Sequence, residues 1–347
     1  MPDFQSFNPL VNAAIFLVSA GLVWVAGARL VKALDRFATI TGIGHAFIGM
    51  LALGAITSLP EVATVGTSSW IGNAPLAVNN VLGSTAANVV LLSFGDLVAG
   101  RRALTSIVTS VATLMQGTLD IILLGLLAII LATGDVAIGG VGVGTLGLGA
   151  VYVFMVWVIV RYRDRRSWVP ARSPDVADLS GQPVNEGREV LPSLLAWSAG
   201  AAAVILVAGT LLSQSGEAIA VQTGLGASLV GMVLVGFATS MPEASSVLNA
   251  VRAGRPEMAM GDILGTNIFN IALLLLGDAL YAGPPILSQA GRFETVATLL
   301  AIVLTAIYVF GLIERSDRSL LRLGYDSWAV LVVYVGGVTT LYFLRGV

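Results

Sequence analysis

The sequence predicts an all-α membrane protein with ten transmembrane helices arranged as two inverted five-helix repeats. Three observations lead to this fold class: an apolar composition, a series of apolar runs long enough to cross a bilayer, and one acidic motif that occurs twice. Of the 347 residues, 56% are hydrophobic and 11% are charged, and the mean hydropathy is +0.90. Soluble domains contain far more charge than this, and about 20 apolar residues in a helix cross the hydrocarbon of a bilayer.

The apolar runs and the turn residues between them predict ten helices, at 9–29, 40–69, 77–99, 107–132, 137–160, 190–212, 226–250, 258–281, 293–313 and 327–345. The runs are solid blocks rather than the alternating short strands of a membrane barrel. No basic residue precedes the first run, so we expect it to stay in the protein as a helix and not to be a signal peptide.

A polar segment at 161–189 separates the two halves and contains six arginines and three prolines. It has too few apolar side chains to build a core, so we predict a linker between a first repeat at 1–160 and a second repeat at 190–347. With both termini outside the cell, 16 of the 18 basic residues fall in cytoplasmic loops. We therefore expect a cell (plasma) membrane protein with extracellular N- and C-termini and a cytoplasmic linker.

The internal repeat appears when the chain is compared with itself, without gaps, so that Glu61 meets Glu243. GMLALGAITSLPEVATV then aligns with GMVLVGFATSMPEASSV, and NVLGSTAANVVLLSFGD aligns with DILGTNIFNIALLLLGD. The matched segments lie at about 44–96 and 226–278. Because each repeat contains an odd number of spans, the second copy enters the membrane from the opposite side, as in many secondary transporters.

Pro60 and Pro242 interrupt the second span of each repeat, because proline lacks a backbone donor and clashes with the preceding turn. Glu61 and Glu243 follow directly, deep in the predicted bilayer, where a charge costs roughly 2.5–3.5 kcal/mol on insertion scales. Neither span contains lysine or arginine near its acid. We therefore expect a bound cation or proton to neutralise the two carboxylates.

The side chains around these glutamates carry oxygen. Four hydroxyls come from the motif itself, and the neighbouring helix of each repeat adds a hydroxyl and an amide at a spacing of four, on one helical face. The chain has no cysteine and one histidine. An oxygen-only shell suits hard cations such as Ca²⁺, whereas softer transition metals prefer imidazole or thiolate.

These motifs resemble the α-repeats of the cation/calcium exchanger superfamily, most closely its Na⁺/Ca²⁺ exchanger branch, which read approximately G-T-S-x-P-E and G-N-x-x-G-S-N-x-x-N/D. The resemblance covers the repeated segment in each half. It implies that Glu61 and Glu243 are the principal calcium ligands and that the backbone carbonyls of Gly54 and Gly236 contribute. It further implies that the calcium and sodium sites are lined by Thr57, Ser58, Thr239, Ser240, Ser84, Thr266, Asn88 and Asn270.

Two positions depart from the family pattern in ways that bear on the ions. Asn270 stands where many relatives, and the potassium-dependent branch in particular, have aspartate, which argues against potassium dependence. Asp262 stands where the first repeat keeps the family's asparagine, Asn80. We treat Asp262 and Asn80 as accessory site residues.

The resemblance and the oxygen shell together predict a secondary active antiporter that exchanges Ca²⁺ for Na⁺ by alternating access. The transported ions are its substrates; we expect no cofactor, no nucleic acid and no obligate protein partner besides the lipid bilayer. The alternative is a proton-coupled Ca²⁺ exchanger in which Asp262 is an added proton carrier. A cation channel would share the acidic cage. An intramembrane enzyme would need a base, yet His45 and Lys32 both lie near the loop between the first two spans.

Three further acids lie in predicted spans. Asp96 and Asp278 match in the repeat and end the third and eighth spans, where they serve either as structural caps or as an ion vestibule. Asp120, which has no counterpart, has either a structural role or a place on a proton path.

Overall fold

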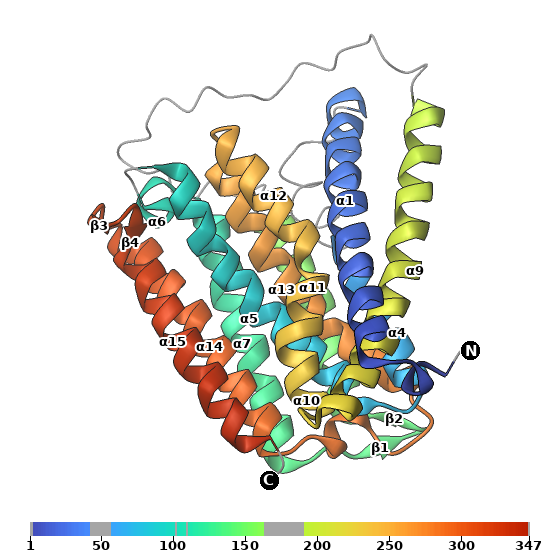
Figure 1. Cartoon of the computed structure of the whole chain (residues 1–347). Helices are drawn as coiled ribbons and strands as arrows, with labels where there is room; N and C mark the ends of the chain where they lie inside the picture. The colour runs from blue at the N-terminus through green and yellow to red at the C-terminus, as the bar shows by residue number, and fades with distance from the viewer. Residues whose placement is uncertain (1–2, 42–56, 101–102, 109, 163–190, 346–347) are drawn as a thin grey trace.

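A computed structural model describes residues 3–41, 57–100, 103–108, 110–162 and 191–345. The described chain is almost entirely helical (Figure 1). Its long helices are α1 (Pro9–Thr41), α4 (Leu59–Trp70), α5 (Ala74–Ala99), α7 (Val111–Thr133), α8 (Val143–Tyr162), α9 (Leu191–Thr223), α12 (Met241–Arg252), α13 (Pro256–Leu280), α14 (Arg292–Glu314) and α15 (Tyr325–Leu344). The short elements are η1 (Phe4–Ser6), α6 (Leu104–Ile107), β1 (Ala137–Ile138), β2 (Val141–Gly142), α10 (Ala227–Val230), η4 (Gly231–Val235), α11 (Gly236–Thr239), η5 (Ile286–Gln289), β3 (Ser319–Leu320) and β4 (Leu323–Gly324).

Seven helices in the described part are long and apolar enough to cross a membrane. A bent pair, Ala227–Thr239 and Met241–Arg252, gives an eighth candidate when its two parts are counted as one span. Two of the ten predicted spans fall outside this set. The span predicted at 137–160 contains a shorter apolar helix, Val143–Ile159, and half of the span predicted at 40–69 lies outside the described residues.

Several helix ends differ from their predicted positions. Helix α1 continues to Thr41 rather than ending at 29, and α9 continues to Thr223 rather than ending at 212. The polar run from Ser213 to Ser215 is buried by the neighbouring helices and does not end α9. The prediction of helix at residues 137–142 is wrong, because these residues form the antiparallel hairpin of β1 and β2. Gly139 and Gly140, with φ values of 61° and 90°, make its turn.

Helices α5 and α13 form the centre of the molecule. In α5, 83% of the apolar span is buried, compared with 17% in α15, which lies at the edge. Helix α5 packs against α4, α12, α13, α14 and α15. Helices α1 and α9 lie side by side on one flank, opposite α14 and α15 (Figure 1). The outer faces remain apolar, as expected of helices that face lipid.

The elements recur at the same offset along the chain as the motifs. The hairpin of β1 and β2 has its counterpart in that of β3 and β4. Contacts between the halves are also reciprocal. A Cβ added to Gly27 in α1 would lie 2.6 Å from Pro242 Cβ in α12, and one added to Gly209, its counterpart in α9, would lie 3.0 Å from the Pro60 carbonyl oxygen in α4. Each half thus supports the broken helix of the other.

Asp96, at the end of α5, joins its own half to the other one. Its Oδ1 accepts a hydrogen bond from the Leu104 backbone (2.7 Å). Its Oδ2 accepts one from the Gly324 backbone in β4 (2.9 Å) and one from the Ser327 hydroxyl in the first turn of α15 (2.6 Å). The carboxylate therefore holds the start of α15. These contacts support a structural role for Asp96 rather than a place in an ion vestibule.

Asp278 repeats this arrangement at the end of α13. Its Oδ1 accepts from the Ile286 backbone (2.7 Å), and its Oδ2 accepts from the Gly142 backbone (2.6 Å) and the Thr145 hydroxyl (2.7 Å). Every one of these partners is the repeat counterpart of the equivalent partner of Asp96. We call these two sets of hydrogen bonds the aspartate latches.

Replacing Asp96 or Asp278 with alanine will destabilise the fold, because each substitution leaves two backbone donors without an acceptor and removes the hydrogen bond from one hydroxyl. We expect the free energy of unfolding to fall by about 2–4 kcal/mol in each variant. The measurement is the thermal midpoint of purified protein in detergent. Asp317→Ala, at an exposed position, is the control. Midpoints equal to that of the control would contradict the role assigned to the latches.

Candidate cation site

The repeated motif lies at a break in the helix in both halves. Ser58 precedes α4 with φ −78° and ψ 9°, and Ser240 precedes α12 with φ −77° and ψ 8°. The helix axis bends by 43° at Ser240. Pro60 and Pro242 lie in the first turn of the new helix, where a missing N–H costs no intrahelical hydrogen bond. Each break therefore creates a helix N-terminus inside the molecule.

Glu61 and Glu243 occupy the first turns of these helices, and both are 0% exposed. The positive end of a helix dipole favours a negative charge at this position. The two carboxylates lie close enough for their charges to interact. The sequence therefore predicted correctly that both acids are buried at a break.

The segment before the second break is drawn tightly onto α5. A π-helical stretch, η4, leads into α11, and π-helical turns are frequent at functional sites. A Cβ added to Gly83 would collide with the Met232 carbonyl oxygen, and one added to Gly236 would lie 2.7 Å from the Ser84 backbone nitrogen. Only glycine allows this approach, which brings Thr239 and Ser240 to α5.

Ser84 links predicted ligands from both repeats. Its hydroxyl donates to Glu61 Oε1 (2.7 Å), lies 2.8 Å from the Ser240 hydroxyl, and accepts from Asn270 Nδ2 (3.1 Å). These four residues come from α5, α4, the second break and α13. The structure therefore brings together side chains from opposite halves of the sequence, such as those of Glu61 and Asn270.

A second set of hydrogen bonds surrounds Asn80. The Thr239 hydroxyl donates to Asn80 Oδ1 (3.2 Å), and Asn80 Nδ2 donates to the Thr64 hydroxyl (2.5 Å). A separate hydrogen bond joins α5 to α13, where Asn88 Nδ2 donates to Asn267 Oδ1 (3.0 Å). Sequence reasoning did not assign Thr64 or Asn267 to the site. Thr64 could have been found, because it lies one turn after Glu61 on the same face of α4.

The cluster also contains buried oxygens without a hydrogen-bond partner in the described part of the chain. Such atoms are costly when buried, because they have lost water without gaining a donor. A bound cation would satisfy acceptors of this kind. Seven belong to predicted ligands: Ser58 Oγ, Glu61 Oε2, Asn88 Oδ1, Glu243 Oε1, Glu243 Oε2, Thr266 Oγ1 and Asn270 Oδ1.

The remaining predicted ligands lie as follows. Thr57 is buried beside Ser58, and Gly54 lies outside the described residues. The Gly236 carbonyl accepts hydrogen bonds from the Ser240 backbone (3.2 Å), the Ser240 hydroxyl (2.9 Å) and the Thr239 hydroxyl (3.1 Å). This oxygen could bind an ion only if a hydroxyl rotated away, because a carbonyl has two lone pairs.

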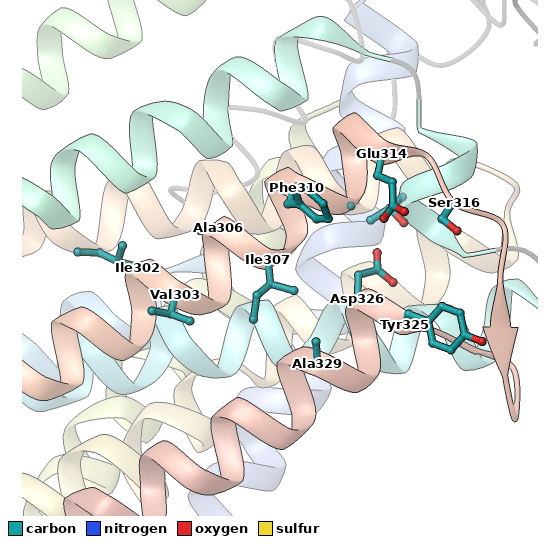
Figure 2. A pocket seen from close by; sticks show the side chains of 12 residues that line it. Ile302, Val303, Ala306, Ile307, Phe310, Glu314, Ser316, Tyr325, Asp326 and Ala329 are labelled. Carbon is teal, nitrogen blue, oxygen red and sulfur yellow. The ribbon is translucent and has the colours of Figure 1, made fainter.

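Two further observations delimit the site. In the described residues, no group of three or more His, Asp or Glu side chains is placed to hold a metal ion, so hydroxyls and amides must supply most ligands. A groove of about 490 Å³ lies elsewhere, between α14 and α15 (Figure 2). Its lining is mostly apolar, including Ile302, Val303 and Phe310, with Glu314 and Asp326 at one end. None of the predicted ligands lines it.

Comparison with known proteins identifies the family. The sequence profile described as "Sodium/calcium exchanger protein" matches residues 11–160 and 193–343. The chain belongs to the sodium/calcium exchanger family. The two matched segments begin at positions 11 and 193, the same offset that relates Glu61 to Glu243. This family member is an integral membrane transporter and not an enzyme.

Relatives of this exchanger-family chain match along nearly its whole length. It is 27% identical over 323 residues to the "Putative antiporter CaxA" of Alkalimonas amylolytica, covering 91% of this chain and 93% of CaxA. It is 25% identical over 344 residues to the "Inner membrane protein YrbG" of Escherichia coli K12, covering 95% and 99%. A structure of the sodium-calcium exchanger NCX_Mj superposes with a TM-score of 0.62 at 18% identity, covering 95% and 98%, which establishes the shared fold.

Gly83→Ala will reduce the yield of folded protein, because the added methyl group meets the Met232 carbonyl where α5 crosses η4. Overpacking of this kind costs roughly 1–3 kcal/mol. The measurement is the monodisperse fraction and thermal midpoint after size-exclusion chromatography. Gly125→Ala in α7, where an added Cβ meets no atom within 4 Å, is the control. An unchanged G83A protein would show that this contact is not tight.

Proposed function

We propose that this chain is a secondary active antiporter that exchanges Ca²⁺ for Na⁺ by alternating access. The observation that carries the proposal is the set of seven buried, unpartnered oxygens, three from the two glutamates at the helix breaks and four from the other predicted ligands. Ca²⁺ binds six to eight oxygens and prefers carboxylates among them. The relatives CaxA, named as an antiporter, and NCX_Mj, named as a sodium-calcium exchanger, support the same activity.

We assign the ions to the residues at the breaks. Glu61 and Glu243 are the principal ligands, with the Gly54 and Gly236 carbonyls as main-chain ligands. Asn80 and Asp262 are accessory residues. The other ligands of the Ca²⁺ and Na⁺ sites are Thr57, Ser58, Thr239, Ser240, Ser84, Thr266, Asn88 and Asn270.

The proposed topology has ten spans in two inverted repeats, at 1–160 and 190–347, joined by a cytoplasmic linker at 161–189. The reciprocal latches and glycine contacts support it, since a two-fold relation between the repeats places matched residues on opposite sides of one interface. The charge distribution supports extracellular termini in the plasma membrane.

The cost of buried charge couples the two fluxes in this proposal. An empty cage with two bare carboxylates would be expensive to close off from water, whereas a cage filled by Ca²⁺ or by Na⁺ ions is neutralised. We place the movement in α1 and α9, which pack against each other and against α12 and α4. Their contacts at Gly27 and Gly209 present no side chain to Pro242 or Pro60, so these helices can slide past the core.

The decisive experiment is ⁴⁵Ca²⁺ uptake into proteoliposomes loaded with Na⁺, with K⁺, or with a pH gradient and no Na⁺. We expect uptake with internal Na⁺ and none with K⁺. Uptake driven by the pH gradient alone would replace Na⁺ coupling with proton coupling. Flux that rises linearly with Ca²⁺ and needs no counter-ion would identify a channel and refute the antiporter.

Glu61→Gln and Glu243→Gln will each abolish Na⁺-driven Ca²⁺ uptake. Each substitution removes one charged ligand at nearly constant volume, and losing a charged hydrogen-bond or ion partner in a buried site costs about 3 kcal/mol or more, over a hundredfold in rate. Glu314→Gln, at an exposed position, is the control and should transport like the unmodified chain. Near-normal uptake by either motif variant would show that its carboxylate is not a ligand.

A further inference from the structure

Asp262 is a buried acid next to the proposed cage. It is 1% exposed and lies one helical turn before Thr266 and two turns before Asn270, so the three side chains share one face of α13. Its repeat counterpart in the first half is Asn80. The two positions can therefore be compared directly.

The two positions differ in how their polar atoms are satisfied. Asn80 accepts from the Thr239 hydroxyl and donates to the Thr64 hydroxyl. Neither oxygen of Asp262 has a partner with hydrogen-bond geometry in the described part of the chain. The hydroxyl of Ser246, the counterpart of Thr64, lies close enough to interact with the Asp262 carboxylate but does not reach hydrogen-bond geometry with it. The Asp262–Ser246 pair is therefore looser than the Asn80–Thr64 pair, and its three oxygens can still accept a cation.

The charges around Asp262 also favour a bound cation. Asp262 lies close enough to Glu243 for their charges to interact. Helices α4, α5 and α13 contain no lysine or arginine, and the one basic residue of α12 is Arg252, exposed at its end. Two buried acids side by side without a counter-charge are unfavourable. Within the described residues, these four helices carry no buried positive charge that could neutralise the pair.

We infer that Asp262 forms, with Glu243 and the Ser246 hydroxyl, a further binding subsite for a hard monovalent cation of the size of Na⁺, adjoining the main cage. The inference rests on the proposed function and specifies its ion content. Two glutamates balance one Ca²⁺. Asp262 adds a third acid beside the cage, so one monovalent cation binds next to the Ca²⁺, or next to the Na⁺ ions that replace it. Oxygen-only ligands suit such a cation.

The subsite is tested by equilibrium binding of ²²Na⁺ to the purified full-length chain in the presence of saturating Ca²⁺. We expect Asp262→Asn to bind one Na⁺ fewer per chain than the unmodified protein. Asp120→Asn is the matched control: Asp120 is also fully buried, and its Oδ2 accepts from Thr305. We expect it to bind as much Na⁺ as the unmodified chain.

Ser246→Ala provides a second test that preserves all three acids. We expect it to weaken Na⁺ binding in saturating Ca²⁺ about three- to tenfold, because one ligand is lost. If D262N does not fold, S246A decides the question. Unchanged Na⁺ number and affinity in the folded variants would overturn the subsite.

The outcomes separate this inference from the proposed function. A chain with Asp262-dependent Na⁺ binding that takes up Ca²⁺ only under a pH gradient would retain the subsite and refute Na⁺/Ca²⁺ exchange. A chain that exchanges Na⁺ for Ca²⁺ but shows no loss of bound Na⁺ in D262N would retain the function and refute the subsite.

Discussion

The structure depends on one constraint: a carboxylate buried in the membrane interior must be compensated locally. Glu61 and Glu243 have no basic neighbour in the buried part of their helices, and the chain compensates them in two ways. The helix breaks place each acid at a helix N-terminus, and oxygen-bearing residues on α5 and α13 surround them. The proline after each break is tolerated because it falls in a first turn. The breaks in the backbone and the polar side chains around them therefore compensate the same two buried acids.

The same constraint explains why the centre of the molecule is polar. Helices α5 and α13 are the most buried elements, yet each presents a row of hydroxyl and amide groups toward the breaks. Glycines at the crossing with η4 and α11 allow the backbones to approach closely, so these short side chains can reach across. Larger apolar residues at Gly83 or Gly236 would improve neither packing nor stability, because they would push the crossing backbones apart.

The sequence alone was sufficient for the family, the membrane-helical class, the two breaks and the burial of both acids, because each depends on local patterns or on residues matched by the repeat. It was not sufficient for residues 137–142, predicted as helix. Their hairpin is held by Asp278, which lies in the other half of the chain from Gly142, and no local pattern carries that contact. The end of α9 was misplaced for a similar reason. The polar residues from Ser213 to Ser215 indicated the end of a membrane helix, whereas neighbouring helices bury them and the helix continues. The difference in hydrogen bonding between Asp262 and Asn80 could not be predicted either, since the identity of a residue does not reveal which of its oxygens lack donors.

The aspartate latches have a consequence for the origin of the chain. Asp96 contacts the hairpin of the second half through the same atoms with which Asp278 contacts the hairpin of the first. Were the halves separate polypeptides of one sequence, these contacts would form an isologous dimer interface in which each subunit caps the other. The two latches of the present chain are related to each other as they would be in a fused homodimer. In a fused chain the halves can diverge, so that one position can carry asparagine in the first half and aspartate in the second.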